Sequence, residues 1–255
     1  MKTRETIISE FNRIRDMGWI ENKFNKAPRA VGMTFENLLG IKENNLPLPD
    51  IGEYELKCQR VKIIPSSLLT LFRLEPEPRD FKMAGYLVEN FGWKPLKWRS
   101  NYSQNELSFR QTINGLSYSD RGFKVNVNRD EDRVEVHFNK DRIDQKHESW
   151  SNSLPEFTTI PYWPFEMLKN KLENKLTNCF YVIACTKSDQ SGKESYKYGD
   201  ITELRDVNFD RFLEQIERGN VLVEFSARTG HNHGTGFRIR QNRVENLYET
   251  VNCIL

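Results

Sequence analysis

The segment at residues 46–60, LPLPDIGEYELKCQR, constrains the fold more than any other part of this 255-residue chain. Its two prolines mark an extended entry, and side chains of opposite character alternate from Glu53 onward. Successive side chains of a β-strand point to opposite faces, so this pattern predicts a strand with one apolar and one polar face. The apolar face carries Tyr54, Leu56 and Cys58, and the polar face carries Glu55, Lys57 and Gln59.

Asp50, Glu55 and Lys57 form the candidate catalytic cluster. Glu55 and Lys57 share a strand face, and Asp50 at the turn before the strand can bend its carboxylate toward the same space. Two carboxylates side by side suit Mg²⁺, which keeps several waters and also binds substrate phosphate. Such a metal stabilises the charge on a phosphodiester under attack, and a lysine beside it can serve the attacking water. The cluster predicts phosphodiester hydrolysis; the alternative is an ordinary charged strand face in water.

Hydrophobic periodicity along the rest of the chain predicts a mixed α/β fold. Helical spacing of apolar residues favours helices at about residues 7–17, 34–40, 164–176 and 209–216, and a short helix is expected before the C-terminus. Thr34 is the expected N-cap of the second helix. Alternating or apolar runs predict strands at 68–72 and 220–228, a hairpin at 123–138 and a strand at 234–240. The pattern changes after Pro161, so we expect a catalytic lobe at residues 1–160 and a second lobe at residues 161–255.

The bulk composition restricts the cellular setting more than the activity. The chain has 38 basic and 36 acidic residues, so its net charge of +2 gives no argument for a nucleic-acid partner. The four cysteines show neither the spacing of a zinc knuckle nor that of a redox dithiol. No apolar run approaches bilayer length. A cytoplasmic protein without a membrane association is the simplest prediction.

A second polar cluster lies near the C-terminal end, where a loop containing His231 and His233 joins two strands. In the strand GFRIR, Arg238 and Arg240 share the face opposite the apolar residues, and Arg228 precedes the loop. Arginine is well suited to a guanine edge because it donates to O6 and N7 together, and a histidine can donate to the same acceptors. The cluster favours contact with DNA bases. The alternatives are a polar surface hairpin or a His-x-His metal site, for which no third ligand is evident.

Four blocks of sequence, taken in order, resemble one nuclease group. Pro49-Asp50 with Glu55-Leu56-Lys57 is similar to the active-site signature of the PD-(D/E)xK nucleases. VGMTFENLLG at 31–40 resembles the helix before that signature in the MutH and MvaI/BcnI group, with Glu36 in the place of a glutamate close to the catalytic strand. SSLLTLF at 66–72 and HNHGTGFRI at 231–239 resemble further segments of the MvaI/BcnI enzymes, the second of which reads bases there.

This resemblance implies a type II restriction endonuclease of the MvaI/BcnI family. Its fold would be a PD-(D/E)xK core, a mixed central sheet flanked by helices, with a catalytic and a DNA-recognition lobe around a DNA cleft. Such enzymes act on double-stranded DNA as monomers, at short sites of the form CC-x-GG, and a cognate DNA methyltransferase is expected in the same system.

Carried over residue by residue, the resemblance also implies roles. Asp50, Glu55 and the backbone carbonyl of Leu56 would bind Mg²⁺, Lys57 would serve the water, and Glu36 would support the catalytic residues. The residues that would face DNA are His231, His233 and Arg238, together with Arg228 and Arg240.

Two other functions remain open at this level. FSAR followed by FRIR also resembles MutH, a mismatch-repair nickase that is activated by a partner protein. Cleavage of both strands without a partner would decide for restriction. The other alternative is a DNA-binding module that keeps the fold without catalysis, against which the joint presence of Asp50, Glu55 and Lys57 argues.

Overall fold

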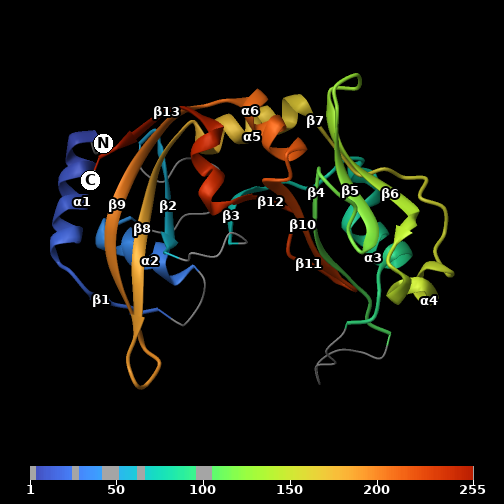
Figure 1. Cartoon of the computed structure of the whole chain (residues 1–255), viewed down its shortest axis with the longest axis horizontal. Coiled ribbons are helices and arrows are strands. Elements are labelled where there is room, and N and C mark those ends of the chain that lie inside the picture. The colour runs from blue at the N-terminus through green and yellow to red at the C-terminus, as the bar shows by residue number, and fades with distance from the viewer. Residues whose placement is uncertain (1–3, 25–28, 42–51, 62–66, 96–104, 255) are drawn as a thin grey trace. The chain divides into compact units, whose positions relative to one another are not determined.

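The computed structural model describes residues 4–24, 29–41, 52–61, 67–95 and 105–254 (Figure 1). These residues form a mixed α/β fold, as predicted from the sequence. The chain divides into two compact units. The first unit comprises Met1–Ser67, Leu172–Asn208 and Val244–Leu255, and the second comprises Leu68–Lys171 and Phe209–Arg243.

The units differ from the expected lobes, because the expected single boundary near residue 160 does not separate them. The reason is the pairing of Tyr54–Arg60 (β2) with Asn178–Ser188 (β8). These strands are parallel, so the chain must cross over between them. The crossover contains residues 68–171, which are the larger part of the second unit.

The first unit is built on a five-stranded sheet in the order β1-β9-β8-β2, with β13 also paired to β9. Besides β2 and β8, its strands are Ile20–Glu21 (β1), Glu194–Val207 (β9) and Tyr248–Cys253 (β13). The antiparallel β8 and β9 form the long hairpin that runs beside β2 in Figure 1. Its N-terminal helices are Arg4–Asp16 (α1) and Ala30–Leu38 (α2).

The start of α2 corrects one expectation. Thr34 was the expected N-cap, but α2 begins four residues earlier, at Ala30. Thr34 is buried within the helix, and its hydroxyl donates to the carbonyl oxygen of Ala30 at 2.8 Å. This hydrogen bond satisfies the hydroxyl inside the helix. Threonine, which often caps helices, is therefore accommodated here one turn after the start of α2.

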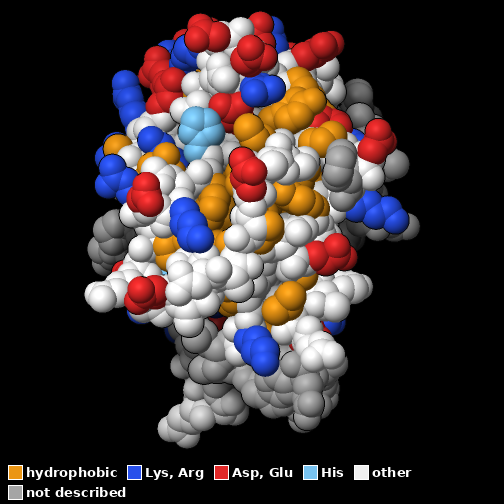
Figure 2. Space-filling view, turned by 90° about the vertical axis from the view of Figure 1, so that its right-hand side faces the viewer, with side chains coloured by type: hydrophobic (Ala, Val, Ile, Leu, Met, Phe, Trp, Pro, Cys, Tyr) orange, Lys and Arg blue, Asp and Glu red, His pale blue; other side chains and the backbone are white. Residues whose placement is uncertain are grey.

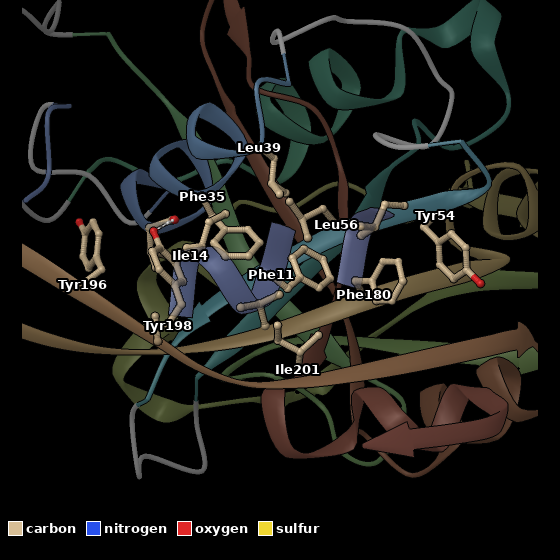
Figure 3. Close-up of a cluster of buried hydrophobic side chains, with 14 of the residues drawn as sticks. Phe11, Ile14, Phe35, Leu39, Tyr54, Leu56, Phe180, Tyr196, Tyr198 and Ile201 are labelled. Carbon is tan, nitrogen blue, oxygen red and sulfur yellow. Dashed lines mark hydrogen bonds between the residues drawn. The ribbon is translucent and has the colours of Figure 1, made fainter. Parts of the chain in front are cut away.

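The core of the first unit lies between α1, α2 and the apolar face of the sheet (Figure 3). Phe11 of α1 packs edge-on against Phe180 of β8, with ring centroids 5.1 Å apart, and Tyr54 stacks on Phe180 at 4.3 Å. Leu56 of β2 points into the same cluster. The predicted apolar face of residues 54–58 is therefore the face that the helices cover.

An ion pair ties α1 to the sheet. Arg4 donates two hydrogen bonds to the carboxylate of Glu203 in β9, at 2.7 and 2.8 Å, and the hydroxyl of Tyr54 donates to the same carboxylate at 2.9 Å. The Arg4 guanidinium holds the pKa of Glu203 below its usual range, while burial and this carboxylate raise the pKa of Tyr54 to about 12. The group fixes the start of β2 next to the catalytic candidates.

The second unit contains two sheets and most of the helical residues outside α1 and α2. One sheet holds Leu68–Arg73 (β3), Ser108–Asn114 (β4), Val221–Arg228 (β10), His231–Asn232 (β11) and Gly236–Arg240 (β12). The other holds Arg121–Asn128 (β5), Arg133–Ile143 (β6) and Tyr162–Pro164 (β7). Its helices are Met83–Phe91 (α3), Glu148–Ser151 (α4) and Phe209–Glu217 (α6), and its 3-10 helices are Arg79–Phe81 (η1) and Gln145–His147 (η2). The helix Phe165–Leu176 (α5) and the 3-10 helix Gln241–Leu247 (η3) begin in the second unit and end in the first.

The strand predictions in this unit are confirmed. The hairpin expected at 123–138 is β5 and β6, and the strand expected at 68–72 is β3. Phe91, Phe109 and Phe123 pack edge to face in its core. Figure 2 shows apolar side chains in patches among charged ones on one side of this unit. An open hollow of about 550 Å³ lies between β6 and the segment at residues 155–160.

Phe180→Ala should lower the free energy of unfolding by about 3–5 kcal/mol, because the ring is fully buried between Phe11 and Tyr54. Urea denaturation of purified protein measures this change. Leu116→Ala, at a side chain that is 71% exposed, is the control and should change stability by no more than about 0.5 kcal/mol. A loss for Phe180→Ala as small as that of the control would contradict the packing described.

Candidate active site

Glu55 and Lys57 lie together on the polar face of β2, as the alternation predicted. The Lys57 ammonium donates to Oε1 of Glu55 at 2.5 Å. The Glu55 side chain is only 3% exposed and that of Lys57 is 15% exposed. This is therefore not a charged strand face in open water: the carboxylate is almost completely buried, and a buried charge requires a partner.

Lys175 supplies a second ammonium to the same carboxylate. Its Nζ lies 3.1 Å from each of the two carboxylate oxygens of Glu55. Lys175 belongs to the last turn of α5, whose Leu172 and Leu176 are buried. Sequence reasoning missed this residue, because a lysine among the several of an amphipathic helix carries no signal that singles it out.

The polar face of β2 continues onto β8. In the parallel register, Glu55 lies beside Cys179 and Lys57 beside Tyr181. The Tyr181 hydroxyl donates to Oε1 of Gln59 at 2.5 Å, and burial raises the pKa of Tyr181. Fully buried Tyr248 contacts Cys179, and burial raises the pKa of Tyr248 well above its usual range. The Glu55 carboxylate thus lies near the buried, uncharged side chains of Cys179 and Tyr248 and is paired with the ammonium groups of Lys57 and Lys175.

Glu36 lies on α2, near Cys58, the residue of β2 that follows Lys57. A Cβ placed on Gly32 would lie 3.6 Å from Oε1 of Glu36 and 3.9 Å from the Cβ of Cys58. The Glu36 carboxylate thus lies close to β2, and it contributes to the raised pKa of Tyr198. Because Cys58 alternates with Lys57, α2 covers the other face of the strand from Glu55.

Asp50 lies outside the described residues, so its place relative to Glu55 is not described. Among the described residues no group of three or more His, Cys, Asp or Glu side chains could hold a metal ion. The donor that they do provide is the Glu55 carboxylate, a hard oxygen ligand of the kind that Mg²⁺ prefers. The described part of the candidate centre thus supplies one ligand of this kind, and a metal site there would need a further carboxylate.

The second cluster is exposed, and its two histidines touch. His231 in β11 and His233 just after it have ring centroids 4.2 Å apart, with Nε2 of His231 3.3 Å from Nδ1 of His233. Two residues that the sequence did not single out fix this loop. Arg73 donates to the carbonyl oxygen of His233 at 2.8 Å, and Glu75 accepts from the side chain of Asn232 at 3.1 Å.

The arginines of this cluster project from one face of the second unit's larger sheet. Arg238 donates to Glu224 at 2.9 Å and to the carbonyl oxygen of Leu68 at 3.3 Å. Arg228 donates to buried Glu106 at 2.7 Å. Arg240, two residues after Arg238 on β12, reaches the carbonyl oxygen of Gly219 at 3.4 Å. All three are partly buried, so each arginine is oriented by its neighbours.

A hollow of about 650 Å³ borders the same hairpin. Its lining includes the basic residues Arg79, Lys82 and Arg228, the acidic residues Glu75 and Glu89, and His231. The hollow is therefore of mixed charge.

Comparison with known proteins identifies the family. The profile of the MvaI/BcnI restriction endonuclease family matches residues 8–248. This chain belongs to that family. A structure of the restriction endonuclease MvaI in complex with cognate DNA substrate is similar, with a TM-score of 0.79, 25% sequence identity and 98% of each chain covered. A structure of MvaI in the absence of DNA gives a TM-score of 0.54 at the same identity and coverage. No curated protein sequence matches the chain.

As a member of the MvaI/BcnI family the chain is a type II site-specific deoxyribonuclease. The resemblance noted in the sequence is thereby confirmed, and the fold matches that of MvaI. In the described part of the chain no helix is long and apolar enough to cross a membrane.

The histidine pair predicts a measurable titration. Desolvation by neighbouring atoms lowers the pKa of His233, and the nearby positive charges of His231, Arg110, Arg228 and Arg73 lower it further. His231→Gln removes one of these cations and should raise the pKa of His233, which NMR titration of the ring protons measures. His137→Gln, on β6, is the control and should leave the midpoint of His233 unchanged. An unchanged midpoint in His231→Gln would contradict the coupling between the two rings.

Proposed function

We propose that this enzyme is a Mg²⁺-dependent restriction endonuclease that cleaves double-stranded DNA at a short site of the CC-x-GG type. The observation that carries the proposal is the buried Glu55–Lys57 pair on β2, in a chain that belongs to the MvaI/BcnI family. The cytoplasm is the proposed location, as predicted from the sequence.

The catalytic roles follow from the chemistry of each group. Asp50, Glu55 and the backbone carbonyl of Leu56 are the proposed ligands of Mg²⁺. The metal would supply positive charge to the phosphodiester under attack and lower the pKa of a water. Lys57 lies beside Glu55, where its ammonium can donate to a phosphate oxygen or orient the water. Water then bonds to phosphorus as the bond to the 3′ oxygen breaks, leaving a 5′-phosphate and a 3′-hydroxyl.

Glu36 has a supporting role in this proposal. Its helix covers the face of β2 opposite Glu55, so the carboxylate acts near the strand rather than within the described Glu55–Lys57 pair. We therefore assign Glu36 to the surroundings of the catalytic residues and not to the reacting atoms.

The recognition residues are the cluster of the second unit. His231 and His233 are exposed and can donate to guanine acceptors, whereas Arg238 and Arg228 are oriented by Glu224 and Glu106. Arg240 shares the face of Arg238 and lies further along β12. Cognate DNA is the partner of MvaI in one of the similar structures, and double-stranded DNA is the partner that we propose here.

The assembly that we propose is a monomer with one catalytic centre, which cuts the two strands in turn. It would be accompanied by a DNA methyltransferase of the same specificity, because a restriction enzyme requires protection of its host DNA. In this view the first unit carries catalysis and the second carries recognition, since the catalytic and recognition candidates fall on different units.

Digestion of unmethylated phage-sized DNA with Mg²⁺, and in parallel with EDTA, tests the proposed function. We expect discrete metal-dependent fragments whose sequenced ends lie within one CC-x-GG-type site, which would also reveal the central base pair. Nicks in one strand only would favour the partner-activated nickase, and metal-independent cutting would overturn the proposal.

Replacement of the catalytic residues tests the centre itself. Asp50→Ala, Glu55→Gln and Lys57→Ala should each lower the cleavage rate at least about 100-fold, because each removes a group that acts only on the reacting atoms. Glu53→Gln is the matched control, two residues earlier on the chain and exposed, and should cleave normally. Normal cleavage by Asp50→Ala and Lys57→Ala would show that the centre lies elsewhere.

Arg238→Ala should reduce the affinity for the specific site by about 1–3 kcal/mol, the usual value of a bidentate base contact. Competition binding with specific and unrelated duplexes, at one salt concentration, measures it. Arg218→Ala, at a largely exposed arginine near the end of α6, is the control. Equal weakening on both duplexes would make Arg238 a phosphate contact.

A further inference from the structure

We propose that Lys175 is a positioning residue for DNA cleavage: its ammonium keeps the Glu55 carboxylate in place while Lys57 turns to the substrate. This inference rests on the proposed function, because it takes Glu55 and Lys57 as catalytic. Lys175 is 118 or more residues away from both in sequence, and only the fold brings it to them.

The need for a second cation follows from the burial of Glu55. Its side chain is 3% exposed, and a carboxylate so buried is costly unless it is paired. Lys57 is one partner, at 2.5 Å from Oε1. Any movement of the Lys57 ammonium to a phosphate oxygen or to water weakens that contact. Without another cation the buried carboxylate would lose its charged partner and could turn away from the reacting atoms.

The geometry of Lys175 meets this need. Its Nζ lies 3.1 Å from both carboxylate oxygens, so it spans the group rather than holding one end. When Lys57 leaves Oε1, Lys175 still faces Oε1 and Oε2. The side chain of Lys175 is 24% exposed, less than a freely solvated lysine, so much of its stem is packed along the protein.

The helix that carries Lys175 is well anchored. Leu168, Leu172 and Leu176 repeat at helical spacing along α5 and are each at most 1% exposed. The next residues begin β8, in which Cys179 lies beside Glu55. Lys175 and Glu55 are thus positioned by one buried helix and by the strand that directly follows it. A side chain placed by rigid elements can hold a catalytic group more precisely than one on a loop.

The test compares three variants of lysines on α5. Lys175→Met keeps the length of the side chain and removes its charge, Lys175→Arg keeps the charge, and Lys169→Met is the control at an exposed lysine of the same helix. We expect Lys175→Met to lower the single-turnover cleavage rate about 10- to 100-fold, the usual effect of a group that orients a catalytic residue. Lys175→Arg should recover most of the rate, Lys169→Met should match the wild type, and the Kd for DNA measured without metal should be unchanged in all three.

A second measurement does not depend on activity. The Tm of Lys175→Met should be lower than that of the wild type, because Glu55 loses a partner. In a Glu55→Gln background the same substitution should have no such effect, because no charge remains to be paired. This cycle separates an action through Glu55 from a general loss of packing.

Three results would overturn the proposal. The first is a wild-type cleavage rate in Lys175→Met. The second is a rate in Lys175→Arg as low as in Lys175→Met, since charge would then not be the cause. The third is an equal loss of Tm with and without the Glu55 carboxylate. Normal cleavage by Glu55→Gln would instead refute the proposed catalytic centre, so the two failures are distinguishable.

Discussion

The parallel pairing of β2 with β8 is the interaction on which the catalytic centre depends. It places Glu55 beside Cys179 and Lys57 beside Tyr181; the helices α1 and α2 pack on the apolar face of β2, and Lys175 of α5 contacts Glu55 on the other face. A parallel pair requires a long crossover, and here the crossover contains the sheet β5-β6-β7 and the strands β3 and β4 of the other sheet of the second unit. The pairing of β2 with β8 therefore positions the candidate catalytic residues in the first unit. It also explains why the first unit is made of segments that are separated in the sequence.

Electrostatics at the centre is governed by the burial of one carboxylate. Glu55 is nearly inaccessible and has two ammonium partners, so this group of three side chains carries one net positive charge. A positive surrounding suits a phosphodiester, which brings negative charge of its own. A buried pair of this kind is weak evidence for stability, since desolvation offsets most of the attraction. We infer that these charges are retained for chemistry rather than for folding.

The recognition cluster shows a different use of charge. Arg238 and Arg228 each donate to a carboxylate, which orients the guanidinium group. The carboxylate also competes with any other acceptor of that guanidinium. The two histidines, in contrast, are exposed and lie against each other. Arg73 of β3 binds the backbone of this loop at the carbonyl oxygen of His233, and Glu75, two residues later, binds the side chain of Asn232. The loop is thus presented by residues more than 150 positions away in the sequence.

The sequence alone determined the two-faced strand at 54–60, the juxtaposition of Glu55 with Lys57, the hairpin of β5 and β6, and the family. The strand and the hairpin are local features, because alternation of apolar and polar residues and short turns depend only on residues close in the sequence. The tertiary structure alone decided the unit boundaries, the position of Thr34 within α2, the burial of Glu55 and its contact with Lys175. The unit boundaries, the burial of Glu55 and its contact with Lys175 depend on which distant segments pack together, and a lysine on an amphipathic helix looks the same in sequence whether it meets water or a buried carboxylate.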